Sequence, residues 1–173
     1  MKVAFWLSAG LIVYAQAGYG VLLAALARLR PRPSVARTPG EPPTVSLVVA
    51  AYAEQAVTIA REFNAQLDYS ENSLMELEAI LVQLSRDMPS SPSSTDEVSE
   101  MCKMWGSYLG EVVRRRFGGE WSIETYPGKQ FATLTLNVNG NKLFPSVKIH
   151  RRLSEGDADN IWTFYRMVSS RLE

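Results

Sequence analysis

One stretch near the start of the chain, Val3–Ala27, limits what the protein can be more than any other feature. It runs for 25 residues without a charged side chain, and only Ser8 and Gln16 are strongly polar. A helix of this length rises about 37 Å, enough to cross a hydrocarbon core of roughly 30 Å. Such a helix satisfies its own backbone hydrogen bonds, as lipid requires. The pattern predicts a transmembrane anchor over residues 1–29.

A secretory signal peptide is the alternative interpretation of the same stretch. The apolar run is longer than the hydrophobic region of a signal peptide, and a single charged residue, Lys2, precedes it. Both features favour the anchor. The membrane is therefore the first partner that the sequence predicts, through Val3–Ala27.

The charges around the anchor predict its orientation. Residues 1–44 carry five Lys and Arg residues, and four of them follow the apolar run: Arg28, Arg30, Arg32 and Arg37. The positive-inside rule then predicts a single-pass protein of the inner (plasma) membrane with its soluble domain in the cytoplasm. The single cysteine, Cys102, excludes an internal disulfide and agrees with a reducing compartment.

Residues 30–44 contain five of the nine prolines, which is typical of an extended linker. The remainder, residues 45–173, has 13 basic and 17 acidic residues. Nucleic-acid binding needs a positive field, so no nucleic-acid partner is expected.

After the linker comes a short apolar run, Val45–Tyr52, whose valines are typical of a buried strand. With the anchor "FWLSAGLIVYAQAGYGVLLAALARLRPRP" and the segment "PPTVSLVVAAYAEQAV", it resembles the start of a membrane-bound family 2 glycosyltransferase. The resemblance covers residues 1–57 and implies that residues 45–57 are the first strand of a nucleotide-sugar-binding domain. Its implied nucleotide-binding residues are Ala51, Tyr52 and Glu54.

The chain departs from that family in ways that argue against catalysis. Ala53 and Gln55 stand where the family has Asn and Glu. The metal motif, the acidic acceptor-base motif and the Gln-x-x-Arg-Trp motif of the family are not identified. The roughly 200 residues of catalytic domain that the resemblance implies do not follow. The resemblance therefore implies no catalytic residue and no cofactor, and no metal site is expected.

From residue 58 onward the patterns predict an α+β domain, residues 58–173. Helices are expected from residue 56 to 67, over residues 74–86 and from a Ser94-x-x-Glu97 capping box to about Phe117. The composition of residues 50–67 also allows the first of these helices to begin earlier and to replace part of the expected strand.

The period then changes to two, which predicts a three-stranded antiparallel meander. Its strands lie over residues 121–126, 132–138 and 142–151, with a hairpin at Asn139–Gly140. A last helix, capped by Ser154 or Asp157, closes the domain.

Three segments of this region, "LDYSENSLMELEAIL", "WGSYLGEVVRRRFGGEW" and "FPSVKIHRRLSEGDADNIWTFY", resemble a small bacterial α+β domain of unknown function over residues 59–171. The likeness implies a fold and a boundary only. The chain then joins a glycosyltransferase-type anchor to this domain near residue 57, and the sequence leaves open whether that join is natural.

One group of residues stands out as a candidate pocket or partner surface: Tyr108, Glu111, Arg115, Glu120, Trp121 and Lys148. The first three share a helix face, because they are three and four residues apart. The group is interpreted as an ion-paired seam between helix and sheet rather than as a pocket. His150 and Cys102 are expected at a solvated strand end and in the core, and Gly106-x-x-x-Gly110 is expected at a close helix contact.

The sequence favours a membrane-anchored, cytoplasmic accessory or partner-binding module without catalysis of its own. A protein partner is expected. The alternative is a truncated or divergent glycosyltransferase relative that retains some nucleotide-sugar binding.

Overall fold

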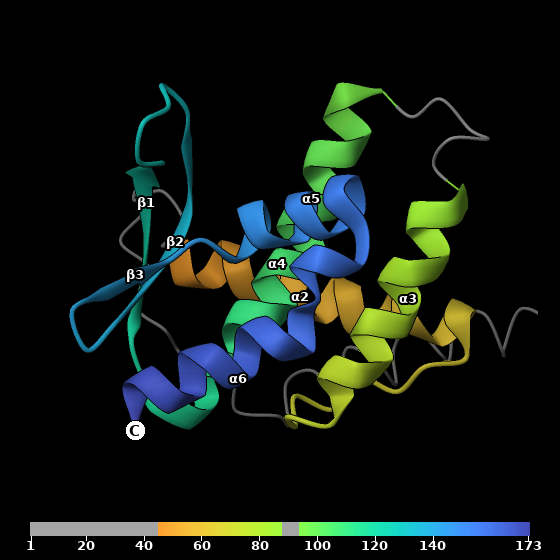
Figure 1. The fold of residues 1–173 in the computed structure, drawn as a ribbon, viewed down its shortest axis with the longest axis horizontal. Helices are drawn as coiled ribbons and strands as arrows, with labels where there is room; N and C mark the ends of the chain where they lie inside the picture. Colours follow the sequence, from red (N-terminus) through yellow and green to blue (C-terminus); the bar gives the residue numbers. More distant parts are fainter. Residues whose placement is uncertain (1–44, 88–93) are drawn as a thin grey trace, which may run out of the picture. The chain divides into compact units, whose positions relative to one another are not determined.

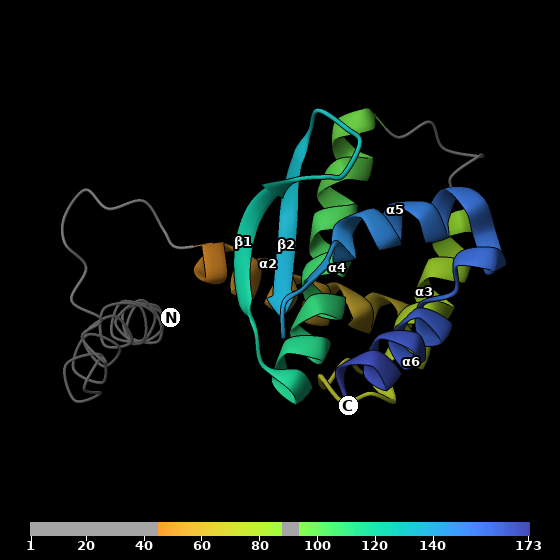
Figure 2. The same ribbon diagram turned by 60° about the vertical axis from the view of Figure 1, so that its left-hand side comes forward.

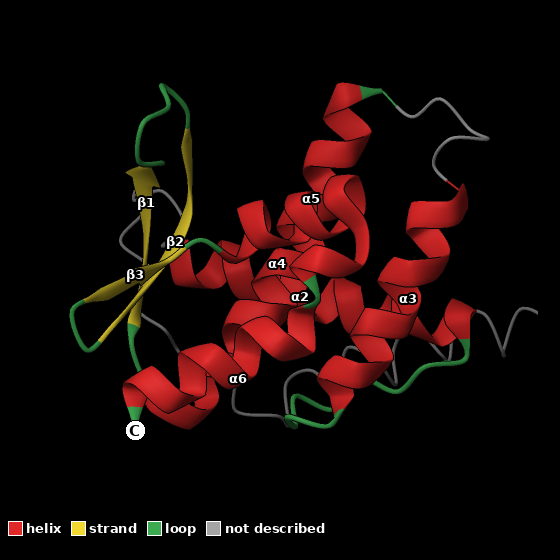
Figure 3. Ribbon diagram, in the orientation of Figure 1, coloured by secondary structure: helices red, strands yellow, loops and turns green. Residues whose placement is uncertain are grey.

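A computed structural model describes residues 45–87 and 94–173. The described residues do not include the predicted anchor, residues 1–29 with Val3–Ala27, or the linker, residues 30–44. The described part contains five α-helices and one three-stranded antiparallel sheet, so the α+β class is confirmed (Figures 1 and 3). None of these described helices is both long and apolar enough to cross a membrane.

The first described element corrects an expectation. Residues Val45–Ala60 form a helix, α2, followed by a short 3-10 turn, Arg61–Phe63, so the expected strand at Val45–Tyr52 is wrong. Valine favours strands where neighbouring strands pair with it, and the sheet of the described residues contains only β1, β2 and β3. Instead α2 packs on α4 through the small buried residues Val49, Ala53, Ala56 and Ala60. The helix also runs across the expected join near residue 57.

The two following helices are as the sequence predicted. Helix α3 spans Ser73–Asp87 and α4 spans Thr95–Phe117. The capping box is present: the Glu97 N–H donates to Ser94 Oγ (3.2 Å) and the Ser94 N–H donates to Glu97 Oε2 (2.8 Å). Helix α4 is the centre of the domain, because α2, α5 and the sheet all pack on it (Figure 2).

The meander is confirmed in its order and in its hairpin. Strand β1 (Glu120–Thr125) pairs with β2 (Ala132–Val138), which pairs with β3 (Asn141–Leu143). Asn139 and Gly140 both have positive φ, 49° and 77°, as a tight hairpin turn requires. Trp121, Leu136 and Val138 are buried on the inner face, toward α4.

The third strand ends much earlier than expected. Residues Pro145–Glu155 form helix α5, so the expected strand from residue 142 to 151 is wrong beyond Leu143. Proline has no N–H for a strand ladder, but its fixed φ suits the first turn of a helix. His150 therefore lies exposed on α5 and not at a strand end.

The chain closes with a 3-10 turn, Gly156–Asp159, and the predicted C-terminal helix, α6 (Ile161–Leu172). Its cap is Asn160, whose side chain accepts the Thr163 N–H (3.0 Å), and not Ser154 or Asp157. Glu78 on α3 links these elements: one oxygen accepts the Arg152 Nε–H (2.6 Å) and the other accepts the Ile161 N–H (2.9 Å). Because Arg152 is buried, this pair holds α3, α5 and α6 together.

Two glycines on α4 allow close approach, as Gly106-x-x-x-Gly110 predicted. A Cβ atom at Gly106 would lie 2.6 Å from the backbone N and Cα of Ser146, at the start of α5. A Cβ atom at Gly110 would collide with the ring of Trp121 on β1. These contacts set the distances of α5 and of the sheet from α4.

We expect Gly106→Ala to destabilise the domain by about 1–3 kcal/mol, because α5 must move away from α4. In an exposed helix the same change would stabilise by roughly 0.5–1 kcal/mol, so the sign of the effect identifies the contact. Urea unfolding of the full chain measures it, with Ser99→Ala on the exposed part of α4 as the control. An unchanged or raised midpoint for Gly106→Ala would contradict the packing described here.

Candidate functional site

The structure brings together part of the predicted cluster. Glu111 Oε1 accepts hydrogen bonds from the indole N–H of Trp121 (2.8 Å) and from Arg114 Nε (2.7 Å), and Oε2 accepts from Arg114 Nη2 (2.9 Å). Arg115 lies farther off, with 3.9 Å between its Nε and Glu111 Oε2. Glu111 thus joins α4 to β1 with both carboxylate oxygens occupied.

Glu120 lines a hollow of about 360 Å³ together with Glu111 and Trp121, whereas Tyr108 and Lys148 lie elsewhere. The Tyr108 hydroxyl is buried between α3 and the loop before it, 2.6 Å from Ser73 Oγ, and it accepts the Tyr69 N–H (2.9 Å). Lys148 on α5 pairs with Asp159 (2.5 Å), and Glu120 is exposed at the start of β1. The six residues therefore do not line one pocket.

The surroundings of Glu111 hold its carboxylate ionised. Burial alone would raise its pKa, but the hydrogen bonds from Arg114 and Trp121 together outweigh burial and lower the pKa below the ordinary value of 4.5. A carboxylate with a lowered pKa and no free oxygen is suited to linking two elements and not to moving protons.

We expect Glu111→Gln to reduce the free energy of unfolding at neutral pH by about 1–3 kcal/mol. Because the folded-state pKa of Glu111 is lowered, its ionised form stabilises the fold at pH values above the ordinary pKa of a carboxyl group. That contribution disappears as the pH falls through the folded-state pKa. Urea unfolding at a series of pH values should show a smaller loss on acidification for Glu111→Gln than for the wild type. Glu120→Gln, at an exposed position, is the control, and equal pH dependence in all three proteins would contradict the assignment.

The three residues implied in nucleotide binding all lie on α2. The Tyr52 hydroxyl donates to Glu100 on α4 (2.7 Å), and Glu54 accepts from the Tyr69 hydroxyl (3.2 Å). Ala51 is exposed. These contacts fasten α2 to its neighbours, and the strand end on which the resemblance placed the residues does not form.

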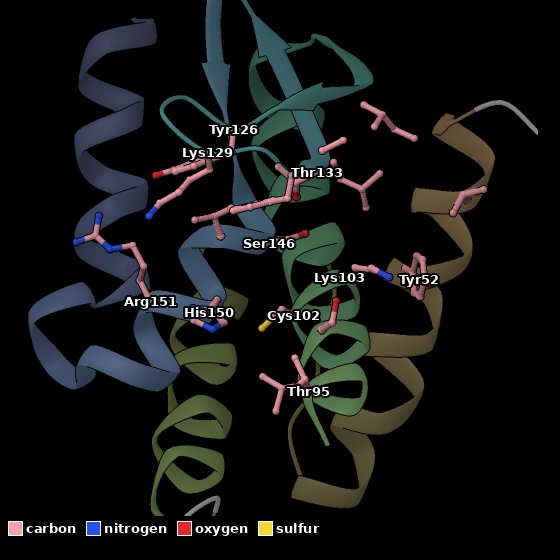
Figure 4. Close-up of a pocket in the computed structure, with 18 of the residues that line it drawn as sticks. Tyr52, Thr95, Cys102, Lys103, Tyr126, Lys129, Thr133, Ser146, His150 and Arg151 are labelled. Atoms are coloured by element: carbon pink, nitrogen blue, oxygen red, sulfur yellow. The ribbon is translucent and has the colours of Figure 1, made fainter. Parts of the chain in front are cut away.

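A groove of about 1040 Å³ lies beneath the sheet, and we name it the sheet groove (Figure 4). The inner face of β1 and β2 forms one wall, together with the loop between them. Helices α2, α4 and α5 form the rest. Its apolar lining residues are Val48, Val98, Cys102, Ile123, Phe131, Ala132, Leu134 and Val147.

Apolar side chains at the mouth of the sheet groove face water. The exposed fraction is 61% for Ile123, 48% for Phe131 and 36% for Val48. Leu47, next to Val48, is 48% exposed. At this end the groove separates the sheet from the first turns of α4, so Ile123 is exposed although it lies on the same face as the buried Trp121.

The charged residues of the sheet groove are mostly basic. Lys103, Lys129 and Arg151 line it (Figure 4). The one acidic residue is Glu155, and His150 also lines the groove. Lys103 pairs with Glu100 (2.6 Å) and Arg151 pairs with Glu155 (3.1 Å) and Asp159 (3.0 Å). Within residues 45–87 and 94–173, Lys129 has no ion pair.

The groove holds one thiol and one imidazole, and their surroundings do not prepare them for catalysis. Burial raises the pKa of the Cys102 thiol to about 11, so the reactive thiolate is scarce at neutral pH. His150 makes no side-chain hydrogen bond to any described residue. The described residues also contain no group of three or more His, Cys, Asp and Glu side chains that could hold a metal ion.

The sequence did not single out the sheet groove. Its residues come from three helices and the β1–β2 hairpin, which are spread along the chain, and each looks ordinary alone. The available signal was the alternation that placed both Trp121 and Ile123 on the inner face, combined with Pro145 soon after the hairpin. Together these two features predict a sheet with more inner face than the chain covers.

Comparison with known protein families matches residues 51–161 to a family described as "Uncharacterised protein YwmA". No curated protein and no solved structure matches the chain. The family match supports the small domain of unknown function that the sequence resembled over residues 59–171. It begins ahead of the expected join near residue 57. The resemblance of residues 1–57 to a glycosyltransferase is not shown by any of these comparisons.

Proposed function

The chain belongs to the family of uncharacterised protein YwmA, and we propose that it is a partner-binding module without catalysis of its own. The docking site is the sheet groove, and its occupant is an apolar segment of another protein. The observation that carries this proposal is the apolar surface at the groove mouth. Leu47, Val48, Ile123 and Phe131 come from α2 and the β1–β2 hairpin and are all more than a third exposed.

Exposed apolar residues that gather around one hollow favour a covered state. Each square ångström of apolar surface removed from water stabilises a complex by about 25 cal/mol. Patches of this kind on soluble domains are typical of sites for other proteins. The N-terminal half of α2 is apolar around its whole circumference, which is typical of a helix that is covered on every side.

The size and shape of the groove favour a polypeptide over other occupants. At about 1040 Å³ it lies at the upper limit of the roughly 300–1,000 Å³ typical of small-molecule pockets. A lipid bilayer is a broad surface that would touch the rim at Ile123 and Phe131 and would not reach Leu134 or Val147 on the walls. A chain with side chains of its own can fill such a hollow. The lining, richer in basic than in acidic groups, favours an acidic residue in the bound segment.

The membrane anchor is the second part of the proposal. We propose that Val3–Ala27 spans the inner membrane and that the linker, residues 30–44, holds the domain at its cytoplasmic face. The support is the uncharged run of 25 residues and the four arginines that follow it. A tethered module would meet partners that are themselves at the membrane, since tethering raises the local concentration.

We expect the full chain to sediment with membranes and to resist extraction at alkaline pH. Ala15→Arg, at the centre of the apolar run, should move much of the protein to the soluble fraction, because a central Arg opposes insertion by about 2.5–3.5 kcal/mol. Ala36→Arg, in the linker, is the matched control and should remain with the membranes. A wild-type chain found in the soluble fraction would contradict the anchor.

The docking site is tested by site-specific photo-crosslinking in the cells that make the protein. With benzoylphenylalanine at Phe131 of the full chain, we expect one discrete protein adduct whose crosslinked segment is apolar. Met75 on α3 and Met167 on α6 have similar exposed fractions, 52% and 48%, but do not line the groove. They are the matched controls and should give no such adduct.

A second substitution ties the adduct to the groove. Val48→Asp places a charge on the opposite wall and should reduce the adduct formed at Phe131 by about tenfold or more. The absence of any adduct at Phe131, or the same adduct from Met75 and Met167, would overturn the proposal.

Nucleotide-sugar binding, the alternative raised by the N-terminal resemblance, gains no support from α2. Tyr52 and Glu54 are engaged with Glu100 and Tyr69. The segment Asp157-Ala158-Asp159 has the spacing of a metal-binding Asp-x-Asp motif. Its carboxylates, however, pair with basic side chains: Asp157 with Arg152, and Asp159 with Lys148 and Arg151.

A further inference from the structure

Half of one edge of β2 is open. Strand β2 runs from Ala132 to Val138, and β1 pairs with all of it. On the other side β3 covers only Leu136, Asn137 and Val138. An uncovered strand edge presents backbone N–H and C=O groups to any extended chain that can lie beside it.

The register of the hairpin shows which residues present these groups. The Tyr126 N–H donates to the Phe131 carbonyl (3.0 Å), so Phe131 directs its backbone groups toward β1. In an antiparallel sheet this direction alternates along a strand, so Thr133 and Thr135 also face β1. Ala132 and Leu134 therefore face the open edge. In the part of the chain that the structure describes, their backbone groups on that edge have no hydrogen-bond partner.

Pro145 is the reason that the edge is open. The pairing of Leu136 with Leu143 would place residue 145 opposite Leu134 and residue 147 opposite Ala132 if β3 continued. Position 145 would then have to donate an N–H to the Leu134 carbonyl, and proline has none. The chain leaves the sheet there and begins α5, so no residue of β3 pairs with Leu134 or Ala132.

The open edge borders the sheet groove. Ala132 and Leu134 line it from β2, and Val147 and His150 line it from α5 on the other side. A strand added at this edge would point alternate side chains along the inner face, into the apolar hollow beside Leu134. The remaining side chains would lie on the outer face, which carries the polar network of Ser122, Glu124 and Asn137 and, toward the β1–β2 loop, the packed rings of Tyr126, Phe131 and Phe144.

We propose that the partner's apolar segment binds as an extended strand on the open edge of β2, continuing the line of β3. This inference rests on the proposed function, because it describes how the same occupant is held in the sheet groove. Ala132 and Leu134 supply the backbone hydrogen bonds, and apolar residues at every second position of the partner fill the groove. Strand addition of this kind gains affinity from the main chain and specificity from alternate side chains.

The end of the added strand nearest the β1–β2 loop lies close to Lys129. This lysine has no ion pair among the described residues, so an acidic side chain at that end of the segment would complement it. The class of ligand is therefore a short strand with alternating apolar residues and an acidic residue near one end.

The test removes one backbone donor and leaves the side chains of the groove in place. Ala132→Pro deletes the N–H that faces the open edge, and proline is accepted at an edge where its N side faces away from the ladder. Ala132 makes a pair with Thr125 that does not use this N–H, so the fold should be kept. With benzoylphenylalanine at Ile123 of the full chain, we expect Ala132→Pro to reduce the adduct by about tenfold.

The matched control is Ala132→Val, which adds similar bulk but keeps the N–H, and it should give the wild-type adduct. Circular dichroism and the thermal midpoint show that both variants are folded. Equal adducts from both variants would overturn strand addition and leave the groove as a docking site. No adduct from the wild-type chain at Ile123 or Phe131 would overturn the proposed function as well.

Amide hydrogen exchange gives a readout that does not depend on substitution. In the free chain the amides of Ala132 and Leu134 should exchange quickly, and those of Thr133 and Thr135, bonded to β1, slowly. In the purified adduct Ala132 and Leu134 should become protected as well. An adduct in which both still exchange as fast as in the free chain would contradict a bound strand.

Discussion

The close approach of two elements to α4 determines the form of the domain. At Gly106 the backbone of α5 lies against α4, and at Gly110 the indole of Trp121 does. Neither contact leaves space for a Cβ atom, so both depend on glycine. Because the two glycines are one helical turn apart, α5 and the sheet meet α4 side by side. These contacts set the positions of the groove walls formed by α4, α5 and the sheet. They do not set the position of α2, which forms the remaining wall.

The groove lies where the sheet and the first turns of α4 are no longer in contact. Trp121, Leu136 and Val138 pack on the buried middle of α4, and this part of the sheet is ordinary core. Farther along, Ile123 and Phe131 line the groove and are exposed. Exposed apolar side chains around a hollow are typical of sites that bind other molecules. The packing that makes the core thereby also makes the candidate site.

Most of the fold was predictable from local signals, and the exceptions have definite causes. The capping box at Ser94, the hairpin at Asn139–Gly140 and the period of α3 each depend on neighbouring residues, and each is confirmed. The run Val45–Tyr52 was ambiguous because a short apolar segment suits a buried strand and a buried helix alike. The prediction of the third strand was wrong beyond Leu143, because Pro145 ends the pairing. A proline interrupts a strand only where its missing N–H would be needed for a hydrogen bond, and that depends on the register.

The candidate site was less predictable than the fold. The pairing of Glu111 with Trp121 followed from residues near each other along the chain, whereas Tyr108 and Lys148 were assigned to the same cluster but face other elements. By itself, the sequence determined the α+β class, the extents of α3 and α4, the hairpin and the glycines of α4, because these follow from spacing and backbone chemistry. Only the tertiary structure decided which apolar residues stay uncovered and which strand edge stays open. Burial and strand pairing depend on contacts between distant segments, and no local pattern records where those segments meet.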